Sequence, residues 1–189
     1  MTEIILASQS PRRSHLLQQA GIPFTVMIQP VEENWPGDMM PEAVPEHIAR
    51  NKALAVKALL PETHLPIVAA DTIVLLNGEI IGKPRNREEA IGTIKKLSAQ
   101  THKVITGVVI LHGTGETSFS ETTEVEFYEL NEHDAAFYVD EYQPFDKAGA
   151  YAIQEWIGIT GIKAIRGDFY NVMGLPVSRL YRVLKKLAL

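Results

Sequence analysis

Short apolar runs and helix-like stripes alternate along the first part of the chain. Ile4–Ala7 is an apolar run, and a helical pattern follows from Ser10 and Pro11 to Gly21. Serine is a favoured N-cap, proline fits the first helical position and glycine often follows the last turn. The pattern therefore predicts a strand, a loop and a helix in that order.

The later elements are predicted from apolar periodicity and from turn signals. Asn77-Gly78 is a strong hairpin signal, and Asn86 and Asn131 stand where helix N-caps are expected. The predicted strands cover 24–29, 67–76, 79–81, 102–112, 117–129 and 163–165; loops cover 30–45 and 147–154; helices cover 46–60, 87–97, 132–140 and 176–189. Because hairpins interrupt the alternation of strands and helices, we expect an α/β fold with a mixed sheet flanked by helices.

Composition narrows the classes of function. The 189 residues carry a net charge of -5, contain no cysteine and are 46% hydrophobic. An acidic chain without an aromatic-rich basic patch is a poor ligand for nucleic acid, and the lack of cysteine excludes disulfides and cysteine-held metals. No apolar run approaches the roughly 20 residues that span a bilayer, and residues 1–7 do not resemble a signal peptide. We expect a single cytoplasmic domain over 1–189, with neither nucleic-acid nor membrane partners.

The first candidate site follows the first predicted strand. Ser8, Ser10, Arg12 and Arg13 surround a helix start, where backbone N–H groups and the helix dipole favour a phosphate. Adjacent arginines add bidentate donors. A plain helix cap with solvated arginines explains the same residues equally well.

Lys52 stands inside the apolar stripe of the helix predicted over 46–60. At about 100° per residue, that stripe contains Ile48, Ala49, Ala53, Val56, Leu59 and Leu60. A lysine in such a stripe either extends its amine to the edge or faces an anion-binding site. The first alternative is the commoner one in proteins.

Asp71 interrupts the apolar strand predicted over 67–76. A carboxylate there is costly unless it is paired or binds a metal, and an uncompensated one becomes more basic. A structural role in capping a turn is the alternative. Because both flanks are apolar, we favour a functional carboxylate.

Three further segments carry candidate groups of weaker specificity. Lys83 ends the hairpin after Asp71, and Glu32 and Glu33 offer oxygen ligands for a divalent ion. Gln154 ends a run of small residues and supplies both a donor and an acceptor, which suits the edge of a base. A solvated lysine, an acidic surface loop and a satisfied glutamine are the plain alternatives.

Taken together, these motifs resemble the Maf family of nucleotide pyrophosphatases. The resemblance runs in order along nearly the whole chain, through LASQSPRR (6–13), Lys52, AADTIV (69–74), GKPR (82–85), THKVITG (101–107), DKAGAYAIQ (146–154) and NVMGLP (171–176). One departure is that Glu155-Trp156 follow Gln154, where family members often have glycine or another small residue.

The resemblance implies a fold like that of the inosine triphosphate pyrophosphatases, with two lobes around a cleft, and a divalent metal, Mg²⁺ or Mn²⁺. It implies that Asp71 is the proton acceptor, and Glu33 with Asp71 is the metal pair that we expect. Ser8, Arg13, Lys52 and Lys83 would hold the triphosphate. Arg12, Thr72 and Gln154 match the positions of substrate choice and resemble the dTTP/UTP branch.

The expected reaction is hydrolysis of dTTP and UTP to the nucleoside monophosphate and pyrophosphate. One alternative is a related pyrophosphatase for another base, such as 7-methyl-GTP. Another is a nucleotide-binding regulator of septum formation, in which turnover is incidental. A nucleotide is the expected small-molecule partner, and a homodimer is left open.

Overall fold

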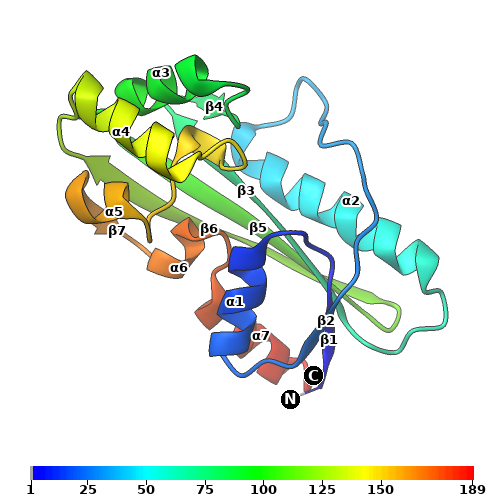
Figure 1. Ribbon diagram of the computed structural model, residues 1–189. Helices are drawn as coiled ribbons and strands as arrows, with labels where there is room; N and C mark the ends of the chain where they lie inside the picture. Colours follow the sequence, from blue (N-terminus) through cyan, green and yellow to red (C-terminus); the bar gives the residue numbers. More distant parts are fainter. Residues whose placement is uncertain (1) are drawn as a thin grey trace. The chain divides into compact units, whose positions relative to one another are not determined.

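The computed structural model describes residues 2–189 and has a mixed α/β fold around a seven-stranded sheet. Figure 1 shows the strands, whose order is β2 (Phe24–Val26), β1 (Ile4–Leu6), β3 (Ile67–Leu76), β5 (Thr101–His112), β6 (Gly115–Phe127) and β7 (Ile162–Arg166), with β4 (Glu79–Ile81) paired to β3. The pairs β1–β2 and β1–β3 are parallel, whereas β3–β4 and β6–β7 are antiparallel. The predicted mixed sheet is therefore confirmed.

The helices connect these strands and vary widely in length. They are α1 (Pro11–Gln19), α2 (Val44–Leu59), α3 (Arg87–Leu97), α4 (Glu132–Tyr142), α5 (Trp156–Thr160), α6 (Phe169–Val172) and α7 (Val177–Lys186), with short 3-10 helices η1 (Pro41–Ala43) and η2 (Ala148–Ala150). Within residues 2–189, none of the helices combines the length and the apolar character that a membrane crossing requires.

The chain divides into two compact units that share three strands. Unit 1 contains residues 1–72, 106–121 and 174–189, and unit 2 contains 73–105 and 122–173. The strands β3, β5 and β6 each contribute residues to both units. Two lobes were expected; the cleft between them and the single domain over 1–189 stay predictions.

In unit 1, α2 packs on the sheet through small side chains. Its Ala49 and Ala53 are fully buried beside Ala69 of β3 and Val109 of β5. The start of α2 comes so close to β5 that a Cβ on Gly107 would lie 2.2 Å from the backbone nitrogen of Glu46. The glycine of the THKVITG segment therefore permits this close approach.

In unit 2, α3 and α4 lie side by side and cover a larger apolar core (Figure 1). Asn86 and Asn131 cap these two helices as predicted, each accepting a 2.8 Å hydrogen bond from a backbone N–H three residues later. The core beneath them includes Ile94, Phe127 and Tyr138, which are almost fully buried.

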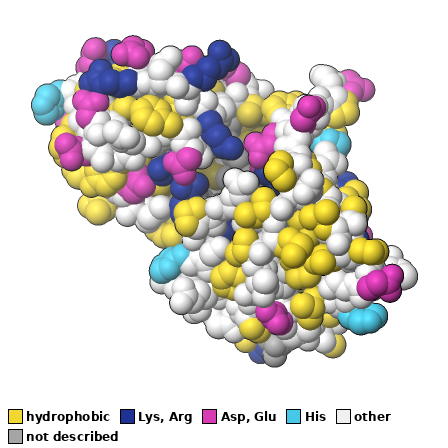
Figure 2. Space-filling model, turned by 45° about the vertical axis from the view of Figure 1, so that its right-hand side comes forward, with side chains coloured by type: hydrophobic (Ala, Val, Ile, Leu, Met, Phe, Trp, Pro, Cys, Tyr) yellow, Lys and Arg dark blue, Asp and Glu magenta, His cyan; other side chains and the backbone are white. Residues whose placement is uncertain are grey.

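Charged side chains on the surface of unit 2 form exposed ion pairs. Lys95 contacts Glu132, and Lys96 contacts Glu79, at 2.8 Å and 2.7 Å respectively. On the face shown in Figure 2, basic and acidic side chains lie intermingled. Such exposed pairs contribute little to stability individually, because solvent and salt screen them.

Several predicted boundaries differ from the structure for physical reasons. The second strand ends at Val26 instead of residue 29, and α2 begins at Val44, since proline is tolerated in a first helical turn. Leu59 was wrongly placed in the buried stripe, because its side chain is 52% exposed at the last turn of α2. The short helices α5, α6 and η1 were not predicted, since one-turn helices carry little periodicity.

A buried histidine in unit 2 gives a prediction for stability. Nε2 of His102 lies 2.8 Å from the Tyr151 hydroxyl, and within residues 2–189 its buried Nδ1 has no hydrogen-bond partner. Burial lowers the pKa of His102 from 6.5 to about 4. Between pH 4 and pH 6.5 the imidazole is therefore protonated in the unfolded chain but neutral in the folded protein. The contribution of His102 to stability is complete above pH 6.5 and is lost as the pH is lowered toward 4.

We expect this histidine to account for about 3 kcal/mol of lost unfolding free energy across that pH window. Denaturant unfolding of His102→Leu at several pH values would measure it, because the variant loses this part of the slope. His133→Ala is the matched control, since the His133 side chain is 92% exposed. An unchanged slope in His102→Leu would contradict the assignment.

Candidate active site

Arg13 is the central side chain of a polar cluster in unit 1. It lies on α1, directly after the β1 loop, and is only 8% exposed. Its guanidinium donates hydrogen bonds to the carbonyls of Gly174 and Ala70 at 2.8 Å and 2.7 Å, and to the hydroxyls of Ser8 and Thr72 at 3.1 Å each. These bonds engage four of the five N–H groups of a guanidinium. The alternative of a solvated arginine is therefore wrong for Arg13.

Two opposing effects act on the pKa of Arg13. Burial lowers the pKa of its guanidinium, and the negative charge of Asp71 raises it. A buried arginine stays protonated under ordinary conditions because its intrinsic pKa is so high. The cluster therefore holds a permanent positive charge beside the Asp71 carboxylate.

Gly174 supplies its carbonyl to this cluster through an unusual backbone conformation. Its φ of +112° is rarely adopted by residues with a side chain. An added Cβ would lie 3.8 Å from Nε of Arg13 and 3.7 Å from Oγ1 of Thr72. The glycine of the NVMGLP segment is thus required by conformation more than by space.

Lys52 joins two carboxylates in the same unit. Its Nζ lies 2.7 Å from Oδ1 of Asp71 on β3 and 2.6 Å from Oε1 of Glu33. The Lys52 and Asp71 side chains are 18% and 12% exposed, whereas Glu33 is 42% exposed. Asp71 is therefore a paired carboxylate, and Lys52 reaches acidic groups instead of extending into solvent.

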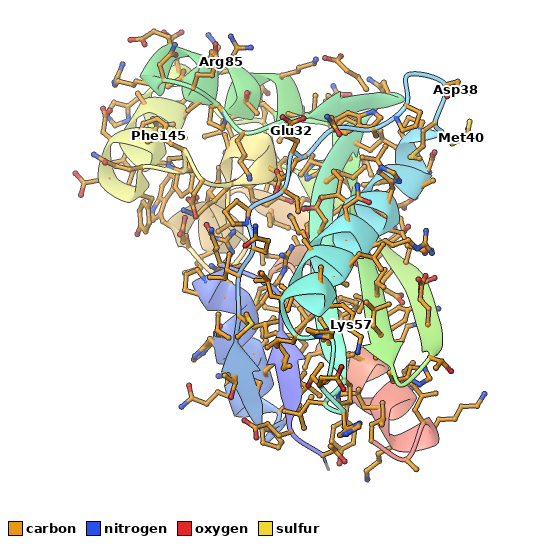
Figure 3. All side chains as sticks on the ribbon, turned by 90° about the vertical axis from the view of Figure 1, so that its right-hand side faces the viewer. Glu32, Asp38, Met40, Lys57, Arg85 and Phe145 are labelled. Carbon is orange, nitrogen blue, oxygen red and sulfur yellow. The ribbon has the colours of Figure 1, made fainter. Side chains whose placement is uncertain are left out.

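Glu33 reaches this ion pair from the long segment between β2 and η1. Figure 3 shows the segment passing from Glu32 to Asp38 and Met40, after which α2 begins. Glu32 itself accepts a 2.9 Å hydrogen bond from the Asn34 amide. Of the two acidic residues singled out in the sequence, Glu33 is the one that pairs with Lys52.

The remaining predicted residues belong to unit 2. Lys83 and Gln154 are both exposed. The backbone N–H of Gly149 donates a 3.2 Å hydrogen bond to the Gly82 carbonyl, which joins the GKP segment to the KAGAYAIQ segment. These two segments, distant in sequence, are thereby neighbours within the unit.

The backbone that carries Gln154 is held by a buried polar network. The Tyr138 hydroxyl donates a short hydrogen bond to Oε2 of Glu155 and accepts one of 3.1 Å from the Ala152 N–H. Lys147, only 8% exposed, lies 3.6 Å from Oε1 of Glu155 and 2.8 Å from Asp146. Glu155 therefore anchors this segment in unit 2.

Trp156, which follows Glu155 and also departs from the family pattern, has a packing role. Trp156 is half-buried and makes an edge contact with Phe137, with ring centroids 5.0 Å apart. The contact shows that Trp156 packs against a helix of the same unit.

The predicted site residues thus separate into two sets. Ser8, Arg12, Arg13, Glu33, Lys52, Asp71 and Thr72 all belong to unit 1. Arg12 is half-buried in the first turn of α1.

Sequence reasoning missed Thr106 and Lys147, which are buried polar residues inside recognised motifs. The polar character of Thr106 within the apolar part of β5 was the available signal.

Comparison with known families decides the assignment. The family model described as Maf-like protein matches residues 3–187. This chain belongs to the Maf family. The match extends over both units of the Maf chain and over every motif that carries its polar clusters.

Several curated relatives of this Maf chain carry the same name, dTTP/UTP pyrophosphatase. One from Bacteroides thetaiotaomicron is 46% identical over 98% of this chain and 96% of its own length. Relatives from Cytophaga hutchinsonii and Phocaeicola vulgatus are 50% and 48% identical, each over 98% of this chain and over 84% and 96% of their own lengths.

Solved structures offer a weaker likeness. The Staphylococcus aureus Ham1 protein has a TM-score of 0.46 and 18% identity, over 67% of this chain and 72% of its own. The expected likeness to inosine triphosphate pyrophosphatases in particular therefore stays a prediction.

Proposed function

We propose that this Maf chain hydrolyses dTTP and UTP to the nucleoside monophosphate and pyrophosphate. The observation that carries the proposal is the Arg13 and Lys52–Asp71 cluster, in which a buried carboxylate lies among fixed positive charges. The names of the relatives that are 46–50% identical support the same reaction and the same bases. A cytoplasmic location and a homodimer stay predictions.

Asp71 is the proposed proton acceptor. A water molecule attacks the α-phosphorus, the bond from that phosphorus to the bridging oxygen breaks, and pyrophosphate leaves with the bond electrons. The proton of the water passes to the Asp71 carboxylate. Lys52 holds Oδ1 of this carboxylate at 2.7 Å, which fixes the orientation of the accepting group.

Ser8 and Lys52 are the proposed phosphate ligands of unit 1. The Ser8 hydroxyl oxygen accepts hydrogen bonds from the Ser10 N–H and from Arg13, so its own O–H remains to donate. An ammonium has three donors, and Glu33 and Asp71 use two of those on Lys52. Arg13 holds Ser8 in place, and Lys83 is the proposed phosphate ligand of unit 2.

Base selection is assigned to Arg12, Thr72 and Gln154. Thr72 is half-buried and directly follows Asp71, and Gln154 is exposed beyond the Glu155 anchor. Hydroxyl and amide groups can distinguish bases by hydrogen bonding. A base with the wrong donors and acceptors leaves these groups without a partner, and it therefore binds less well.

The residues present fit a divalent ion. Glu33 and Asp71 each place an oxygen within 2.7 Å of the Lys52 ammonium, so the two carboxylates that would hold the ion lie close together. Mg²⁺ is commonly held by one or two carboxylates together with water and substrate phosphates. When bound, such an ion neutralises developing charge on the phosphates.

We expect hydrolysis to require added Mg²⁺ or Mn²⁺ and to disappear in excess chelator. The reason is that a triphosphate brings about four negative charges, more than Arg12, Arg13 and Lys52 can neutralise. Direct chromatography of the monophosphate product measures this without a metal-dependent coupling enzyme. Full turnover in excess chelator would reject the metal.

A substrate panel tests the proposed function. Specificity constants for dTTP, UTP, CTP, GTP and 7-methyl-GTP are expected to be highest for dTTP and UTP. A tenfold or greater preference for 7-methyl-GTP would replace the base assignment but keep the reaction class. If no triphosphate were hydrolysed while UTP still bound, the nucleotide-binding regulator would be favoured instead.

A further inference from the structure

Thr106 is a fully buried hydroxyl in β5 that the proposed mechanism does not use. Its side chain is 0% exposed, and its Oγ1 lies 2.9 Å from Oγ1 of Thr72. Both residues belong to unit 1. Thr106 therefore contacts a residue assigned to base selection from the side that a substrate does not reach.

The hydrogen bonds around Thr72 decide which way its proton points. Its oxygen accepts a hydrogen bond of 3.1 Å from Nη2 of Arg13, so one of its two lone pairs is occupied. Its proton has two acceptors to choose from, Thr106 at 2.9 Å and the Gly174 carbonyl at 3.4 Å. Only the first distance lies in the normal O–H···O range of about 2.5–3.0 Å.

Either hydroxyl can be the donor across these 2.9 Å. If Thr106 donated, the Thr72 proton would be left with the Gly174 carbonyl at 3.4 Å, so the distances favour donation from Thr72 to Thr106, which leaves Thr72 one lone pair. Because Arg13 and Thr106 fix the other positions on its oxygen, that lone pair makes Thr72 a hydrogen-bond acceptor toward a ligand. Without Thr106, the proton is free to turn toward the ligand, and Thr72 then offers a donor as readily as an acceptor.

We infer that Thr106 is a positioning residue for base selection, which holds Thr72 as an acceptor for the ring N–H of uracil and thymine. This inference rests on the proposed function. Uracil and thymine carry a hydrogen on N3, whereas N3 of cytosine is an acceptor. Two acceptors facing each other leave both unpaired, so cytosine is rejected.

The test is the ratio of the kcat/KM values for UTP and CTP in Thr106→Val. Within one variant, losses of folded protein or of phosphate handling affect both substrates equally and cancel in the ratio. We expect the preference for UTP to fall by about tenfold, as expected when one hydrogen-bond distinction is lost. Thr106→Ser keeps the hydroxyl and should retain the wild-type ratio.

Thr123→Val is the matched control. Thr123 is also a 0% exposed strand threonine, but its hydroxyl bonds to the Asp168 backbone and the Asn171 amide in unit 2. Thr123→Val should therefore be less stable than the wild type but keep the same ratio of kcat/KM values for UTP and CTP. If Thr106→Val does not fold, Thr106→Cys offers a weaker acceptor in similar volume and should show a smaller fall.

The outcomes separate this inference from the proposed function. An unchanged ratio in Thr106→Val, or in Thr106→Cys if only that variant folds, overturns the role of Thr106 while the hydrolysis of UTP stands. The role is equally overturned if Thr123→Val lowers the ratio as much. A wild-type protein that hydrolyses CTP as well as UTP refutes the proposed base preference and this inference together.

Discussion

Asp71→Asn is expected to lower kcat for UTP by about 10³-fold while the protein stays folded. The substitution removes the proposed proton acceptor but preserves the size of a side chain that is only 12% exposed. Lys52 keeps its 2.6 Å contact with Glu33, so its charge does not become unpaired. Steady-state kinetics, together with thermal unfolding followed by circular dichroism, would measure both effects.

Asp140→Asn provides the control for that loss. Asp140 pairs with Arg87 on the surface of unit 2, at 2.5 Å from Oδ1 to Nε, and its side chain is 49% exposed. It should leave kcat unchanged, because the screened pair contributes little. Near-normal turnover in Asp71→Asn would remove Asp71 from the mechanism, even with the family assignment intact.

Elements with local signals were predicted well from the sequence. The hairpin over 67–81 has the predicted boundaries, because Asn-Gly is a specific turn signal between apolar runs. The helices after Asn86 and Asn131 begin where predicted, because each cap hydrogen bond is made by the residues that the sequence places there. These elements depend on contacts within a few residues.

Contacts between distant residues could not be predicted in this way. Pairing of Lys52 with Glu33 depends on the path of a long irregular segment, and Thr106 contacts Thr72 across neighbouring strands. No periodicity or spacing in one sequence specifies such partners. Arg13 was singled out as a phosphate ligand, but its four protein acceptors became apparent only in the structure.

Arg13→Met is expected to lower the free energy of unfolding by about 3–5 kcal/mol, because a buried hydrogen-bonded charge is lost and its acceptors are left without a partner. The four groups that lose a donor are the carbonyls of Ala70 and Gly174 and the hydroxyls of Ser8 and Thr72. For a chain of this size the change corresponds to a fall of about 10 °C in the midpoint of thermal unfolding. Denaturant and thermal unfolding would measure it.

Stability and kinetics together distinguish the two roles of Arg13. If it serves mainly as a ligand for the triphosphate, Arg13→Met lowers kcat/KM and leaves the unfolding midpoint unchanged. If it holds the cluster together, the midpoint falls even without nucleotide, and Arg13→Lys restores only part of it, since an ammonium cannot reproduce the planar array of donors. Arg12→Met is the neighbouring control: Arg12 is half-buried on the same helix, and its loss should cost about 1 kcal/mol or less. Equal destabilisation by both substitutions would show that the hydrogen bonds of Arg13 are not the cause.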